Sequence, residues 1–214
     1  CLNTVETASV MYSNCTNMVV PLVIGIFGED WVMYVTCYSI VQTILVWTHA
    51  RILISGKKEI SLRDLVCNVN ILAIGLFLFA FQIRLPAVIR SAFAMAGNTM
   101  GPVAMLIIGM LMADMDMQHL RSYRQLWKPV LLRLIVLPVI LVCVAKYSGL
   151  AALAPHGETL IIISLLSVIA PSANIVPQFS QMFGRDALYA SLINTVTMLL
   201  CIITMPLMIT LFQM

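Results

Sequence analysis

Charged residues are scarce in this chain. Of its 214 residues only 10% are Asp, Glu, Lys or Arg, whereas 61% are hydrophobic. A soluble domain carries about 25% charged residues, which keep its surface in water. The composition therefore excludes an ordinary soluble globular domain, because so much apolar surface would form patches that water does not tolerate.

Residues that hold metals or perform catalysis are also few. The six cysteines stand singly, with no CxxC pair, and there are only three histidines. No P-loop, GxSxG or HExxH motif occurs. We therefore expect no enzyme activity, no metal site and no cofactor, and we interpret the cysteines as small apolar side chains. The net charge of +3, with no basic stripe interleaved with aromatics, argues against nucleic acid as a partner.

Long uncharged segments are what the sequence does contain. A helix of about 20 apolar residues crosses the hydrocarbon core of a bilayer, and seven windows meet this requirement. They are residues 7–28, 31–48 with an extension to 54, 65–83, 91–113, 129–145, 159–184 and 187–214. Apart from Arg51 in the extension of the second window, only window 129–145 contains a charged residue, Arg133. The sequence therefore predicts an all-α, polytopic integral membrane protein with seven transmembrane helices.

Basic residues are distributed unevenly between the windows. Nine of the 12 Lys and Arg residues fall on one side of the predicted membrane and three on the other. Cytoplasmic loops carry an excess of Lys and Arg, so we expect the loops around Lys57 and Arg121 in the cytoplasm, with the N-terminus inside. This orientation counts against a seven-helix receptor, whose N-terminus lies outside. For Arg133 we favour a side chain that extends to the cytoplasmic interface over one that binds an anion.

Two windows share a motif in the same register. The pattern P-x5-F-G-x-D begins at Pro21 near the end of the first window and at Pro177 near the end of the sixth. A polar patch precedes each copy, at residues 13–17 and 171–174. Because the two windows are an odd number of crossings apart, the copies point in opposite directions across the membrane. Inverted repeats with interrupted helices at corresponding positions indicate a transporter site.

The predicted site lies where these two helices are interrupted. Proline removes a backbone donor and clashes with the preceding turn, so we expect both helices to be broken at proline and to cross in mid-membrane. For either proline alone, a simple kink is the alternative. Gln42 and Asn194 also lie within windows, and we interpret them as hydrogen-bonding glue between helices. The predicted substrate-binding residues, which share helical faces beside the breaks, are Asn14, Asn17, Pro21, Asn98, Pro171, Ser172, Asn174, Pro177 and Gln178.

Three stretches resemble the auxin efflux carrier family of membrane transporters, including bacterial malate and malonate permeases. They are residues 14–21 with the following Phe-Gly, residues 170–174 with the later Gly-x-Asp-Ala, and residues 98–109. Thr16 and Val19 depart from glycines that the family often has. The resemblance implies ten helices in two inverted five-helix repeats, of which the first three would be absent here. Residues 1–54 would then end the first repeat, 55–64 form a cytoplasmic loop, and 65–214 form the second repeat.

The same resemblance implies a function. Family members are secondary transporters that move a small organic anion, such as a dicarboxylate or an auxin-like acid, by elevator-type alternating access. It also implies a homodimer in the lipid bilayer, which for a bacterial member is the inner membrane. Coupling to H⁺ or Na⁺ stays open, because no Asp or Glu lies at the centre of a window. A receptor, a channel and a membrane-embedded enzyme are the alternatives, although no ring of like groups or nucleophile–base pair supports the last two.

Overall fold

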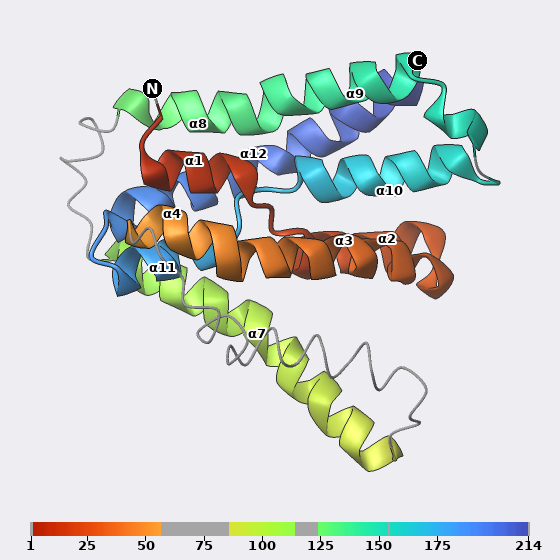
Figure 1. The fold of residues 1–214 in the computed structure, drawn as a ribbon. Helices are drawn as coiled ribbons and strands as arrows, with labels where there is room; N and C mark the ends of the chain where they lie inside the picture. The colour runs from red at the N-terminus through yellow and green to blue at the C-terminus, as the bar shows by residue number, and fades with distance from the viewer. Residues whose placement is uncertain (1, 57–85, 114–123, 154, 214) are drawn as a thin grey trace.

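The computed structural model describes residues 2–56, 86–113, 124–153 and 155–213 (Figure 1). These residues fold almost entirely into helices, and among them the only extended pairing is one isolated β-bridge. The all-α prediction is therefore confirmed for the described part of the chain. The α-helices are α1 (Thr4–Met11), α2 (Cys15–Phe27), α3 (Val32–Leu45), α4 (Arg51–Ser55), α7 (Ala87–Ala113), α8 (Trp127–Leu131), α9 (Leu137–Tyr147), α10 (Gly157–Ile169), α11 (Ile175–Met182) and α12 (Ala187–Gln213).

Short turns of other helix types extend or connect these elements. Three are 3₁₀ turns: η1 (Glu29–Trp31), η4 (Arg124–Leu126) and η6 (Leu150–Leu153). Two are π-helical turns, η2 (Val46–Ala50) between α3 and α4, and η5 (Leu132–Val136) between α8 and α9. A π turn inserts an extra residue into a continuous helix and is frequent at functional sites.

Among the described residues, three continuous helices are long and apolar enough to cross a membrane. They are Glu29–Ser55, Trp127–Tyr147 and Ala187–Gln213, and they match the second, fifth and seventh predicted windows. The fourth window lies within α7. The third window, 65–83, and the loop predicted at 55–64, apart from its first two residues, lie outside the described part of the chain.

The first and sixth windows each fold as two helices separated by a break. In the first window, α1 ends at Met11 and α2 begins at Cys15. In the sixth window, α10 ends at Ile169 and α11 begins at Ile175. Ala170 is extended, with ψ at 149°, as expected of a residue that precedes a proline.

The prediction that Pro21 and Pro177 break these helices is wrong. Pro21 lies inside α2, which continues past it, and Pro177 lies in the first turn of α11. A backbone N–H has no intrahelical partner in a first turn, so proline is accommodated there. The break in the first window comprises residues 12–14, seven to nine residues before Pro21, and the break in the sixth window comprises residues 170–174, which include Pro171.

The two broken segments run in opposite directions. α1 packs against α11, and α2 packs against α10, so the chain passes the crossing one way in the first segment and the other way in the second. Figure 1 shows this directly, with α1 and α11 towards one end of the helices and α2 and α10 towards the other.

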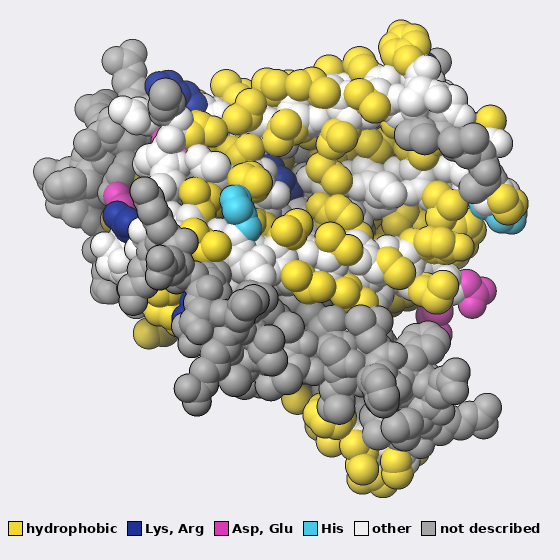
Figure 2. Space-filling model, viewed as in Figure 1, with side chains coloured by type: hydrophobic (Ala, Val, Ile, Leu, Met, Phe, Trp, Pro, Cys, Tyr) yellow, Lys and Arg dark blue, Asp and Glu magenta, His cyan; other side chains and the backbone are white. Residues whose placement is uncertain are grey.

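Apolar side chains cover the outer surface of the helices. Figure 2 shows hydrophobic residues spread along the described helices on the visible face rather than gathered in one patch. Leucine, isoleucine and valine side chains of α3, α9 and α12 point outward, as the exposure of Val41, Ile140, Val144, Leu199, Ile202 and Ile203 shows. Such a surface is stable in contact with lipid.

Charged residues gather near the helix ends. Arg124, Lys128 and Arg185 belong to the end formed by η4, α4 and α11, where the Arg185 Nε donates to the Ile54 carbonyl at 2.9 Å. Glu29 and Glu158 belong to the opposite end (Figure 1). These three residues of the basic side thus lie at one end, although the placement of that end in the cytoplasm stays a prediction. α7 leaves the other helices obliquely and packs on α12.

Candidate functional site

The backbones of the two breaks pair with each other where the segments cross. Ser13 and Ser172 form an antiparallel bridge. The Asn14 N–H donates to the Pro171 carbonyl at 2.8 Å, and the Ala173 N–H donates to the Tyr12 carbonyl at 3.0 Å. Unwound backbone inside a membrane protein needs such partners, because lipid offers none. Each break therefore satisfies the other.

Asparagine side chains meet at this crossing. The Asn14 Nδ2 and the Asn194 Nδ2 both donate to the Asn174 Oδ1, at 3.2 and 3.1 Å. The Asn194 Nδ2 also donates to the Ser172 carbonyl at 2.7 Å, and Thr197 accepts from the Ser172 N–H at 3.2 Å. α12 thus holds the second break in place.

This network leaves polar atoms without partners. The Asn174 Nδ2 and the Asn194 Oδ1 make no hydrogen bond, although both atoms are buried in residues that are at most 5% exposed. An unpaired buried polar group costs about 1–3 kcal/mol, and buried polar atoms in native structures are nearly always paired. The two free atoms therefore indicate a polar ligand or water at the crossing.

A cavity of about 410 Å³ opens at the crossing. The N-terminal ends of α2 and α11 both reach it, and none of the described residues that line it is Asp, Glu, Lys or Arg. Amide and hydroxyl side chains dominate its polar part. The lining residues are Ser13, Asn14, Thr16, Asn17, Ser39, Gln42, Thr43, Val46, Trp47, Gly97, Ala173, Asn174, Ile175 and Gln178.

One wall of the cavity comes from α3 and η2, which sequence reasoning did not assign to the site. The Ser13 Oγ donates to the Gln42 Oε1 at 2.8 Å, and the Gln42 Nε2 donates back to the Ser13 carbonyl. Trp47 lies beside Phe179, with ring centroids 5.2 Å apart and planes at 80°. A polar stripe in the second window pointed to this wall, since Ser39, Gln42, Thr43 and Trp47 are spaced as one helical face.

Four of the predicted site residues line the cavity, namely Asn14, Asn17, Asn174 and Gln178. Pro171 and Ser172 form part of the crossing backbone itself.

The other three predicted site residues neither line the cavity nor belong to the paired backbone of the crossing. Pro21 is exposed on α2, and Pro177 is buried within α11. Asn98 is exposed on α7, although its neighbour Gly97 lines the cavity.

Arg133 does not extend to the cytoplasmic interface, so that prediction is wrong. Its side chain is only 2% exposed. Its guanidinium donates to the Ala170 carbonyl from Nε at 3.1 Å and from Nη2 at 2.8 Å, and to the Val10 carbonyl from Nη1 at 2.6 Å. Position in the sequence alone placed Arg133 near a window edge, whereas the two breaks supply acceptors deep within the protein.

A carboxyl group is also buried in the first broken segment. Glu6, just before the first predicted window, is 2% exposed. It accepts from the Tyr189 hydroxyl at 2.6 Å and from the Asn3 N–H at 2.8 Å. The second bond belongs to the capping box that starts α1, a pattern in which the N-cap and the third helical residue bond each other. The sequence pattern thus missed a carboxyl that the fold buries.

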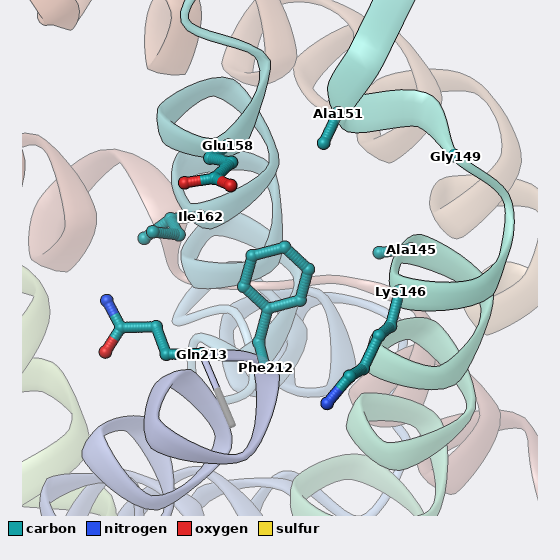
Figure 3. Close-up of a pocket in the computed structure, with 8 residues that line it drawn as sticks. All are labelled: Ala145, Lys146, Gly149, Ala151, Glu158, Ile162, Phe212 and Gln213. Atoms are coloured by element: carbon teal, nitrogen blue, oxygen red, sulfur yellow. The ribbon is translucent and has the colours of Figure 1, made fainter.

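A second cavity, of about 280 Å³, lies away from the crossing. The ends of α9, α10 and α12 and the connecting segment line it, and Figure 3 shows Lys146 and Glu158 on either side of Phe212. It contains charges of both signs and none of the predicted site residues. The crossing is therefore the better candidate for the functional site.

Two broken helices that run in opposite directions and cross at a polar cavity, within an apolar helical surface, define a membrane transport protein. The comparison with protein families agrees. The family model described as membrane transport protein matches residues 2–209, so the chain belongs to this family, the auxin efflux carrier family of membrane transporters. No curated protein and no solved structure matches the chain.

Proposed function

We propose that this transporter moves a small organic anion, and that the anion binds in the cavity at the crossing. The observation that carries this proposal is that the first turns of α2 and α11 line one cavity, with no charged residue among its described lining residues. The buried Asn174 Nδ2 has no partner, and the first turns of α2 and α11 lie beside it.

Helix N-termini favour anions for two reasons. The first N–H groups of a helix have no intrahelical acceptor, and the aligned peptide dipoles place partial positive charge there. In α2 and α11 the N-cap residues Asn14 and Asn174 make no capping hydrogen bond to their own helix. Neither side chain therefore competes with a carboxylate for the first N–H groups of its helix.

The cavity also suits the organic part of such a substrate. Its volume of about 410 Å³ lies within the range of about 300–1,000 Å³ typical of small-molecule sites. Val46 and Trp47 supply apolar surface to its lining. None of the described lining residues carries a negative charge, and Trp47 is the one Phe, Trp or Tyr among them, so they offer a cationic substrate neither an acidic partner nor an aromatic cage.

Transport proceeds in this proposal by alternating access of the crossing. The crossed segments and the helices packed on them, α3 and α12, move together and carry the site from one side of the membrane to the other. α7 belongs to the static scaffold through which two copies form a homodimer. The oblique direction of α7 and the exposure of Phe93, Met95 and Met110 support this division. The organism's cell membrane, an inner membrane in bacteria, is the proposed location.

An uptake and thermal-shift screen tests the substrate class. The full-length protein in proteoliposomes and in detergent would be presented with malate, malonate and indole-3-acetate, with their amides, and with cationic amines. We expect the acids to be transported and to raise the unfolding midpoint, whereas the amides and amines do neither. Equal binding of the amides or amines would contradict an anion site and point to a neutral or cationic substrate.

A further inference from the structure

The guanidinium of Arg133 bonds to both breaks but is not among the described residues that line the cavity. All three hydrogen bonds that it makes with described residues go to backbone carbonyls, two to Ala170 and one to Val10. The only other charged side chain buried among the described residues is Glu6. Glu6 bonds to Tyr189 and Asn3 instead. The positive charge of Arg133 is thus held by carbonyl dipoles.

The two acceptors belong to the C-terminal ends of the two half-helices. Val10 is the residue before the last of α1, and Ala170 is the C-cap of α10. The last carbonyls of a helix have no intrahelical donor, and the helix dipole places partial negative charge on them. In transporters with broken helices such carbonyls coordinate the coupling cation. A cation site is therefore present at this crossing, and an arginine side chain occupies it.

The local helix geometry brings Arg133 to these acceptors. It is the second residue of the π-helical turn η5, in the middle of the continuous helix Trp127–Tyr147. η5 packs against α1 and α12. The planar guanidinium presents several donors in a fixed fork, which allows one side chain to bond both half-helices.

We propose that Arg133 is a resident cation that replaces a bound metal cation at the crossing. It joins the C-terminal ends of α1 and α10 and fixes the position of the two breaks, so it is a positioning residue for the substrate cavity. The crossing then needs no Na⁺ to hold its shape. This role stands on the described contacts and does not depend on which substrate the transporter carries.

The first test uses the unaltered protein. Its unfolding midpoint in detergent would be measured in NaCl, LiCl, KCl and choline chloride at equal ionic strength. We expect the same midpoint in all four salts, because the site is already occupied. A cation that binds the folded state stabilises it by mass action. An increase of about 5 °C specific to Na⁺ or Li⁺ would therefore overturn the proposal.

The second test removes the resident cation and asks whether another takes its place. Arg133→Ala leaves the carbonyls of Val10 and Ala170 without a donor and opens space beside them. We expect this variant to be less stable in choline chloride and to gain about 5 °C in millimolar guanidinium or Na⁺. Lys128→Ala, exposed on the same continuous helix, is the matched control and should show no cation dependence.

A side chain that merely fills space would not produce a cation dependence. A folded Arg133→Ala variant with no response to guanidinium, Na⁺ or Li⁺ would overturn the proposal. If Arg133→Ala yields no folded protein in any salt, Arg133→Lys and Arg133→Met decide between charge and packing. The lysine variant must then recover folded protein and the methionine variant must not, and equal behaviour of the two would contradict a resident cation. A failure of every acid to bind would refute the proposed substrate class without changing these results.

Discussion

The two sides of the helix crossing present opposite chemistry. On one side the N-terminal ends of α2 and α11 reach a cavity of about 410 Å³, where the Asn174 Nδ2 has no partner. On the other side the C-terminal ends of α1 and α10 meet Arg133, which bonds the carbonyls of both. Hydrogen-bond donors thus lack a protein partner on the cavity side, whereas on the other side the helix carbonyls accept hydrogen bonds from Arg133.

This difference follows from one physical cause. Breaking a helix exposes N–H groups at one new end and carbonyls at the other, with partial charges of opposite sign. Two broken helices that run in opposite directions bring like ends together. The chain supplies its own cation for the carbonyl ends and leaves the N–H ends for a ligand. We therefore expect substitutions on the carbonyl side to change mainly stability, and those on the cavity side to change mainly binding.

The largest expected effect is on the carbonyl side. Arg133→Met removes three hydrogen bonds and leaves two buried carbonyls unsatisfied. We expect a loss of about 3–5 kcal/mol in the free energy of unfolding, as for loss of one partner of a buried charged interaction. Denaturant unfolding in detergent would measure it, with the exposed Lys128→Met as control. A loss no greater than that of the control would contradict the assignment of Arg133 as the bond between the two half-helices.

The next effect concerns the cavity side. Asn174→Ala removes the unpaired donor and should weaken binding of an organic acid by about 10- to 100-fold, because a hydrogen bond to a charged group contributes about 1.5–3 kcal/mol. Titration of the acid against intrinsic fluorescence or unfolding midpoint would measure the affinity. Gln181→Ala, an exposed amide on the same helix α11, should leave the affinity unchanged. Equal affinities of the Asn174 and Gln181 variants would place the substrate elsewhere.

A smaller effect is expected for the hydrogen bond that joins α12 to α1. Tyr189→Phe removes the 2.6 Å bond to Glu6 and should cost about 1 kcal/mol of unfolding free energy. Tyr147→Phe, at a position 84% exposed, is the control. Binding of acids should be unchanged in both variants, since neither tyrosine lines the cavity. A loss of affinity in Tyr189→Phe alone would show that the two sides are coupled more closely than the structure indicates.

Several features of this fold were predictable from residue pattern. Long apolar windows identified the helices, and the repeated P-x5-F-G-x-D motif identified the two windows that are broken. Asn14 and Asn174 were identified because each lies in a polar patch that precedes a copy of the motif, on one helical face with other predicted site residues. Each of these inferences uses spacing along one helix, which the sequence displays directly.

Contacts between distant segments were not predictable in this way. Arg133 was assigned to the interface because nothing in the sequence shows that the carbonyls of Val10 and Ala170 lie near it. Glu6 was placed outside the membrane windows, whereas its partner Tyr189 lies on α12. A charged side chain is buried only where partners are available, and those partners are set by the packing of several helices.

The sequence motif and the structure differ most clearly in where they place the two helix breaks. The motif proline Pro21 was predicted to hold the first break open, but it lies exposed within α2. Pro171, outside the repeated motif, lies at the second break and accepts from the Asn14 N–H.

Pro21→Ala should therefore have the smallest effect of all. The new N–H can bond the Asn17 carbonyl one turn earlier, so we expect an increase of about 0.5–1 kcal/mol in unfolding free energy. Acid binding should stay within about twofold of the unaltered protein, a difference of about 0.4 kcal/mol. Pro171→Ala is the matched comparison. It frees Ala170 to become helical, so that α10 can extend into the crossing, and it should weaken both stability and binding. Uptake in proteoliposomes and unfolding in detergent would be measured for the two variants together. If Pro21→Ala abolished binding while Pro171→Ala preserved it, the first break would lie at the motif proline and the crossing described here would be wrong.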